Sequence, residues 1–169
     1  MTRLAAHRAR AALLAGVLLL ATLTACTPTV PMQVADDAAN PLCAEVSVRL
    51  PKLIDAAAIR ATDAQATAAW GNPARILLTC GVAVPGPSTA RCVTIAGVDW
   101  LVDDSNVKRG VFTTFGRNPA VQVVVDHVVS DSNALNALSD AVGTNRATGR
   151  CLDPAEVSTG GGAITAPKN

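Results

Sequence analysis

The chain has 169 residues, of which half are apolar, and its 14 basic and 13 acidic side chains give a formal charge of +1. It has two tryptophans, two phenylalanines and no tyrosine. These are too few for the row of stacking platforms that nucleic-acid binding uses, and the chain lacks a basic footprint. We therefore expect no nucleic-acid partner, and the length suits one domain with one core.

The first 25 residues have the pattern of a signal peptide. Arginines at positions 3, 8 and 10 precede an apolar run from Ala11 to Ala21, which is shorter than the span of about 20 residues that crosses a membrane. The next segment, LTAC at 23–26, resembles the lipobox of bacterial lipoproteins, in which the cysteine thiol receives a diacylglyceryl group before cleavage.

We therefore expect a signal peptide at 1–25, lipidation of Cys26, and an extracytoplasmic protein anchored to the outer face of the cell membrane. A plain secretory signal followed by an unpaired thiol is the alternative. Removal of the signal peptide takes away three of the 14 basic side chains and no acidic one, so the formal charge changes from +1 to −2.

Export makes disulfides the expected state of the other four cysteines, Cys43, Cys80, Cys92 and Cys151. Four cysteines allow three pairings, and spacing alone does not choose among them. None belongs to a CxxC motif, and His127 is the only histidine after the signal peptide, so zinc, haem and thioredoxin-type sites lack ligands. We expect structural disulfides, no metal and no cofactor.

The remaining chain predicts an α+β fold in a single small domain at 41–152. Residues 26–40 read as a lipidated cysteine and a flexible tether, Asn40 and Pro41 begin a helix that Pro51 ends, and the alanine-rich stretch from 51 to 69 reads as irregular. Strand-like runs follow at 75–84, 92–95, 98–104, 111–117 and 120–129.

A second helix is predicted at 130–143, where Ser or Asp caps, an apolar stripe and Gly143 coincide. The short connections between the strands favour antiparallel hairpins. We thus expect an antiparallel sheet of about four to five strands with an N-terminal and a C-terminal helix packed on it, and a disordered tail at 153–169.

Several segments then become familiar in their order: Cys43 with Leu50 and Pro51, WGNP at 70–73, ILLTCGV at 76–82, AGVDWL at 96–101 and FTTFGR at 112–117. This order resembles an actinobacterial family known only as domain of unknown function 3515. The resemblance implies an envelope protein, secreted or lipid-anchored, without an assigned activity. It also implies a bridge between Cys43 and Cys80, which leaves Cys92 with Cys151. Thr79 and Ala96 depart from the residues usual in that family.

Catalytic patterns are weak. Ser105 and Lys108 match S-x-x-K but fall in a predicted turn and lack the partner motifs of penicillin-binding enzymes. Asp99, Asp103 and Asp104 lack the loop spacing of a calcium site. We assign no catalytic residue and expect a non-enzymatic binding or interaction module with an unknown envelope protein or ligand as partner. The alternatives are an envelope hydrolase, for which His127 would need a nearby serine and acid, or a disulfide-based redox protein.

The candidates for a binding surface are Trp70, Asp99, Trp100 and Arg117, because aromatic residues and arginine often contribute most of the energy at interfaces. The competing interpretation is structural, with tryptophans in the core and Asp99 and Arg117 as a cross-strand pair.

Overall fold

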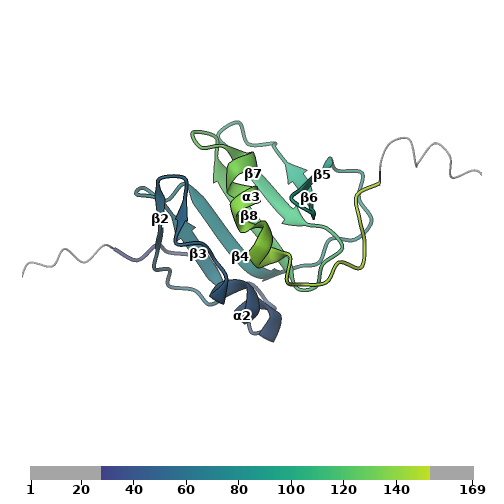
Figure 1. The fold of residues 1–169 in the computed structure, drawn as a ribbon, viewed down its shortest axis with the longest axis horizontal. Helices are drawn as coiled ribbons and strands as arrows, with labels where there is room; N and C mark the ends of the chain where they lie inside the picture. Colours follow the sequence, from purple (N-terminus) through teal and green to yellow (C-terminus); the bar gives the residue numbers. More distant parts are fainter. Residues whose placement is uncertain (1–27, 153–169) are drawn as a thin grey trace, which may run out of the picture.

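The computed structural model describes residues 28–152 and shows one antiparallel sheet of eight strands with two helices on one face (Figure 1). The helices are α2 (Pro41–Val48) and α3 (Asp131–Val142). The strands are β1 (Leu53–Ile54), β2 (Ala57–Arg60), β3 (Thr67–Trp70), β4 (Ile76–Val82), β5 (Cys92–Ile95), β6 (Val98–Asp103), β7 (Arg109–Thr114) and β8 (Ala120–Asp126). Their order across the sheet is β1-β2-β3-β4-β8-β7-β6-β5. The signal peptide and Cys26 predicted above lie outside the described residues, as does the predicted tail.

The expectation of an α+β domain with four to five strands is wrong, because the sheet has eight strands and the fold is mostly sheet. The additional strands are β1, β2 and β3, which occupy the alanine-rich stretch expected to be irregular. Alanine favours helices and is depleted in strands, so local preference points away from this outcome. Pairing of β3 with the edge of β4, from Thr67↔Thr79 to Trp70↔Ile76, overrides that preference.

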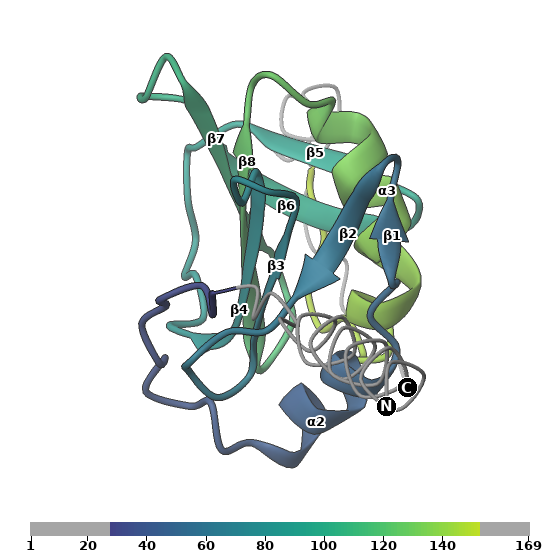
Figure 2. The same ribbon diagram turned by 90° about the vertical axis from the view of Figure 1, so that its left-hand side faces the viewer.

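The sheet curves around α3. Its two edge strands, β1 and β5, both contact this helix, and Figure 2 shows α3 between the front and rear of the bent sheet. The core fills the inner side of the curve with side chains of alternate strand positions, as the pleat requires. Its largest fully buried members include Trp70, Trp100, Leu78, Leu135 and Leu138.

Both helices begin at side chains that cap them. The Asn40 side chain accepts a hydrogen bond from the Leu42 amide at the start of α2, and Ser130 Oγ accepts one from the Asn133 amide at the start of α3. The apolar stripe predicted for the second helix is buried against the sheet. The positions of both helices agree with the capping signals in the sequence.

The segment before α2 is not a free tether over residues 30–38. Val30 pairs in parallel with Thr62, and its amide donates to the carbonyl of Ala61 at 2.9 Å. Farther along, the Asp37 amide donates to the carbonyl of Gly81 at 3.1 Å, and Ala38 is buried. Between these points the segment runs beside the outer face of β4 and β8, where Leu77 lies. We call residues 28–38 the N-terminal strap.

Candidate functional site

Trp70 and Trp100, two of the four proposed surface residues, are core residues. Both are 0% exposed. Trp70 Nε1 donates to the carbonyl of Pro51 at 2.9 Å, which joins the end of β3 to the chain before β1. Neither tryptophan therefore presents a side-chain surface to a partner in this conformation.

Arg117, the third of these residues, is 6% exposed and binds backbone carbonyls. Its guanidinium donates to the carbonyl oxygens of Asn145 and Gly143 after α3, and to that of Gly97 at 3.2 Å. Burial lowers the pKa of the guanidinium, and the charge of Asp99 opposes that shift. An arginine remains charged under all ordinary conditions. Arg117 thus ties the β5–β6 turn to the chain that leaves α3.

Asp99 completes this arrangement on β6. Its carboxylate accepts hydrogen bonds from the Thr94 hydroxyl and, at 2.9 Å, from the Cys151 amide. Beside it the Gly116 carbonyl accepts a hydrogen bond from the Thr148 amide at 2.6 Å. Asp99, Gly116, Arg117 and Cys151 form what we call the C-terminal clamp, and they line or border an open hollow of about 380 Å³. Asp99 and Arg117 both line this hollow, but they form no cross-strand salt bridge, because Arg117 donates to backbone carbonyls and Asp99 accepts from Thr94 and Cys151.

Two disulfides are present in the structure. One joins Cys43 of α2 to Cys80 of β4, with both residues fully buried, and the other joins Cys92 of β5 to the half-buried Cys151. These are the pairs implied by the family resemblance. Because Cys43 follows the N-terminal strap and Cys80 precedes Gly81, the buried bridge stands beside the place where the strap crosses the end of β4.

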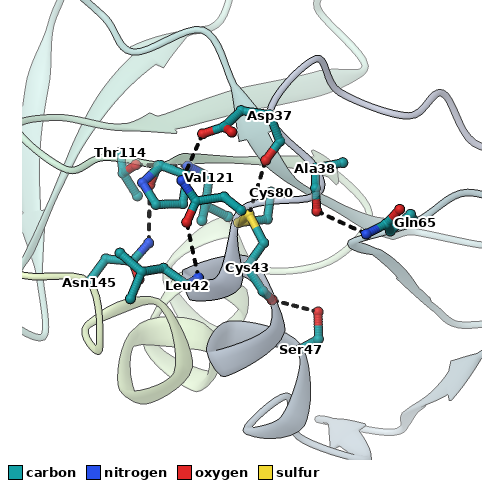
Figure 3. The surroundings of a disulfide bond; sticks show 12 residues. Asp37, Ala38, Leu42, Cys43, Ser47, Gln65, Cys80, Thr114, Val121 and Asn145 are labelled. Carbon is teal, nitrogen blue, oxygen red and sulfur yellow. Dashed lines mark hydrogen bonds between the residues drawn. A yellow bond between two sulfur atoms is a disulfide. The ribbon is translucent and has the colours of Figure 1, made fainter.

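Figure 3 shows this crossing around the buried disulfide. Asp37 and Ala38 pass next to the bridge, and the Gln65 side chain donates to the Ala38 carbonyl at 3.4 Å. The register of β4 and β8 shifts between Cys80 and Val82, so Gly81 is the extra residue of a β-bulge, with a φ of +88°. A Cβ atom on Gly81 would lie 2.5 Å from the Ala38 amide nitrogen. Only glycine allows both the bulge and the close approach of the strap.

The other end of the strap is held by the chain at the end of β2. Arg60 Nη2 donates to the Pro28 carbonyl at 2.6 Å, and Nη1 donates to the Gly71 carbonyl at 3.3 Å. The Asp63 carboxylate accepts from the Met32 amide at 2.7 Å. We call Arg60, Ala61, Asp63 and Gly81 the N-terminal clamp. It fixes the chain from Pro28 onwards.

Sequence reasoning missed most of the N-terminal clamp. Gly81 was within reach, because a glycine inside the strand-like run ILLTCGV signals a bulge or a close backbone approach. Arg60 gave no such signal, because its role depends on a contact with a carbonyl 32 residues away in the chain.

The residues considered for catalysis serve local structure. His127 Nδ1 lies 3.5 Å from a carboxylate oxygen of Asp131, and within residues 28–152 no serine hydroxyl bonds to this histidine. Ser105 donates its amide to Asp103 at 3.0 Å in the turn after β6. Hydrogen bonds from Ser105 lower the pKa of Asp103, and those from Arg91 lower the pKa of Asp104. Both carboxylates are exposed, Asp103 at the end of β6 and Asp104 in the turn that follows.

Residues 28–152, which the structure describes, contain neither a cluster of metal-binding side chains nor a membrane-spanning helix. No group of three or more His, Cys, Asp or Glu side chains there is placed to hold a metal ion. Neither α2 nor α3 has the length and apolar character needed to cross a membrane.

The fold and its two clamps define a small antiparallel-sheet domain in which both ends of the described segment, residues 28–152, are held by backbone contacts and disulfides. The chain belongs to the family described as "Protein of unknown function (DUF3515)", whose model matches residues 9–151. No curated protein and no solved structure matches the chain. The family membership expected from the sequence is thus confirmed, and it brings no assigned activity.

Proposed function

We propose that the mature protein is a lipid-anchored, extracytoplasmic interaction module of the cell envelope that acts by binding and not by catalysis. The pairing of the cysteines supports this proposal, because it leaves only Cys26 available for lipidation. All four cysteines within residues 28–152 are paired, and the fifth, Cys26, is the one in the lipobox-like segment. Disulfides persist in oxidising compartments, and lipidation requires a free thiol.

The roles of the charged residues favour binding over catalysis. Asp99 and Arg117 hold backbone groups of residues 143–152, which we call the C-terminal segment. Arg60 and Asp63 hold backbone groups of the N-terminal strap. A catalytic group needs access to a substrate, whereas these groups already satisfy backbone donors and acceptors.

Substitution of the lipobox cysteine tests the anchor. In Cys26→Ala we expect the protein to move from the detergent phase to the aqueous phase, and to lose incorporation of a labelled fatty acid. Two acyl chains anchor a protein stably because each buried methylene contributes about 0.8 kcal/mol. Thr27→Ala is the matched control and should behave as wild type. Retention of Cys26→Ala in salt-washed membranes would show that the anchor is not on this residue.

The binding role is tested by capture from intact membranes. We expect the lipidated protein to retain a defined envelope component, identified by mass spectrometry, and a reduced and alkylated sample to lose it because breaking both disulfides destabilises the fold. Free thiols at Cys92 and Cys151 in protein isolated without reductant would instead support the redox alternative.

A further inference from the structure

Chain connectivity places the lipidation site close to the N-terminal clamp. Two peptide units separate Cys26 from Pro28, and consecutive Cα atoms are about 3.8 Å apart, so the two Cα atoms lie within about 7.6 Å of each other. This limit holds for any conformation of the intervening residue. A lipid group on Cys26 is therefore attached almost directly to the body of the domain.

The clamp fixes the direction of this attachment. Pro28 is held by Arg60 at 2.6 Å, and the next residues are held through Val30 and Asp63. These contacts involve the last residue of β2 and the residues that follow it, so several points fix the orientation of the strap relative to the sheet. Figure 2 shows the start of the coloured chain beside the end of β2.

We infer that the domain rests against the phospholipid bilayer by one defined side, the β1–β2 edge, which comprises Leu53, Ala58, Ile59 and Arg60. The inference rests on the proposed lipidation of Cys26. We assign the bilayer as the surface that this edge contacts, because the chain that bears the lipid enters the fold at this edge. The protein is thus held in a fixed orientation on the membrane, and its partner meets the opposite side.

The β1–β2 edge exposes apolar side chains of the kind that bury at the boundary between headgroups and acyl chains. Leu53 is 59% exposed and Ile59 is 39% exposed, although both are large apolar side chains. Leu53 pairs with Ala58 across the two strands, so these two side chains share a face of the sheet. Pro28, Ala58 and Arg60 also line an open hollow of about 570 Å³ next to the entry point of the chain.

The turn between β6 and β7 marks the opposite side. Three strands, β3, β4 and β8, lie between β2 and β7, which corresponds to about 19 Å measured along the curved sheet at a spacing of about 4.8 Å per strand. In Figure 2 this turn is at the upper left, away from the start of the coloured chain. Val107 in the turn is 89% exposed and provides a reporter position for the distal side.

The experiment measures the depth of two reporters in the full lipidated protein. A fluorescent non-canonical residue replaces either Ala58 or Val107, which avoids a sixth cysteine. Each protein is reconstituted into vesicles of phosphatidylcholine and phosphatidylglycerol with a nitroxide on a fraction of the headgroups. We expect quenching at position 58 to exceed that at position 107 several-fold.

Loss of the clamp should abolish this difference. In Arg60→Ala the Pro28 carbonyl loses its donor, so we expect the two reporters to be quenched more equally while the protein stays bound. Arg49→Ala is the matched control, because Arg49 pairs only with Glu45 on its own exposed helix turn. Circular dichroism of each variant verifies that the sheet is intact.

The outcomes separate the orientation from the anchor. Vesicle binding with equal quenching at both positions in the wild type would overturn the orientation and leave the anchor in place. If wild-type protein isolated from the envelope carries no acyl group and does not bind vesicles, the proposed function fails and the orientation fails with it. Greater quenching at position 107 would reverse the assigned sides and also contradict the inference.

Discussion

The two ends of the described chain are fastened to the same sheet by different means. The N-terminal strap is held by hydrogen bonds at the end of β2 and at the Gly81 bulge, and a buried disulfide follows it. The C-terminal segment is held by Arg117, by Asp99 and by a half-buried disulfide at its last described residues. The first disulfide lies in the core, whereas the second joins the edge strand β5 to the end of the described chain. The difference predicts which attachment can open without unfolding the domain.

Removal of each disulfide should give the largest contrast. The pair Cys43→Ala/Cys80→Ala should lower the free energy of unfolding by about 2–5 kcal/mol, because it removes a native, fully buried bridge from a small domain. The pair Cys92→Ala/Cys151→Ala should cost less and release mainly the C-terminal segment. Urea titration followed by circular dichroism measures both.

The loop lengths make this contrast informative. The second bridge closes the longer loop, with a sequence separation of 59 against 37, so chain entropy alone predicts that its loss costs slightly more. A greater loss for the Cys92–Cys151 pair would therefore show that loop closure, and not burial, determines the ranking.

Each segment also passes over a glycine, and alanine there should displace it. A Cβ atom would lie 2.5 Å from Ala38 N at Gly81 and 2.6 Å from Gly149 Cα at Gly116, and both glycines have positive φ. We expect each substitution to cost about 2–3 kcal/mol, from left-handed backbone strain and overpacking together. Thermal or urea unfolding measures the loss.

Gly97→Ala is the matched control for the glycine pair. Gly97 has a φ of +77°, but a Cβ atom on it would meet nothing within 4 Å, so its substitution should show the backbone term of about 1 kcal/mol alone. Equal losses at Gly81 and Gly97 would mean that the strap yields to the added methyl group without cost.

Arg117→Ala tests the C-terminal clamp through its side chain. We expect a loss of about 2 kcal/mol, because buried backbone carbonyls of the chain after α3 lose a charged donor. Arg117→Lys should recover part of it, since a single ammonium group cannot reproduce the planar fork of a guanidinium. An unchanged unfolding midpoint in Arg117→Ala would contradict the structural role and return Arg117 to the candidates for a partner contact.

The smallest effect concerns acid stability. Hydrogen bonds from Arg75 and from the Val128 amide lower the pKa of Asp126 below its ordinary 3.8. A carboxylate with a depressed pKa contributes stability that is present above the unfolded pKa and is lost as the pH falls through the folded pKa. Asp126→Asn should therefore reduce stability slightly at neutral pH and weaken its dependence on pH below about 4. Identical pH profiles for the variant and wild type would contradict this contribution.

The sequence predicted the elements whose local signals agree with their environment. Capping residues located α2 and α3, and runs of β-branched residues located the strands from β4 to β8. The three strands in the alanine-rich stretch were missed because their residues favour helix and become strands only by pairing with β4. Trp100 and Arg117 were named as candidates for a surface, but burial is a property of the assembled sheet and not of a residue type.

The described fold begins at the N-terminal strap, whose first residue, Pro28, is two residues after the expected lipidation site. Hydrogen exchange of the lipidated protein tests the attachment of the strap most directly at the amides of Val30, Asp37 and Asp63, which donate to Ala61, Gly81 and Val30 respectively. We predict protection of these amides close to that of the Cys80 amide within the sheet. Exchange at the rate of an unstructured peptide, with the sheet still protected, would show that the strap is a free tether and would contradict the account.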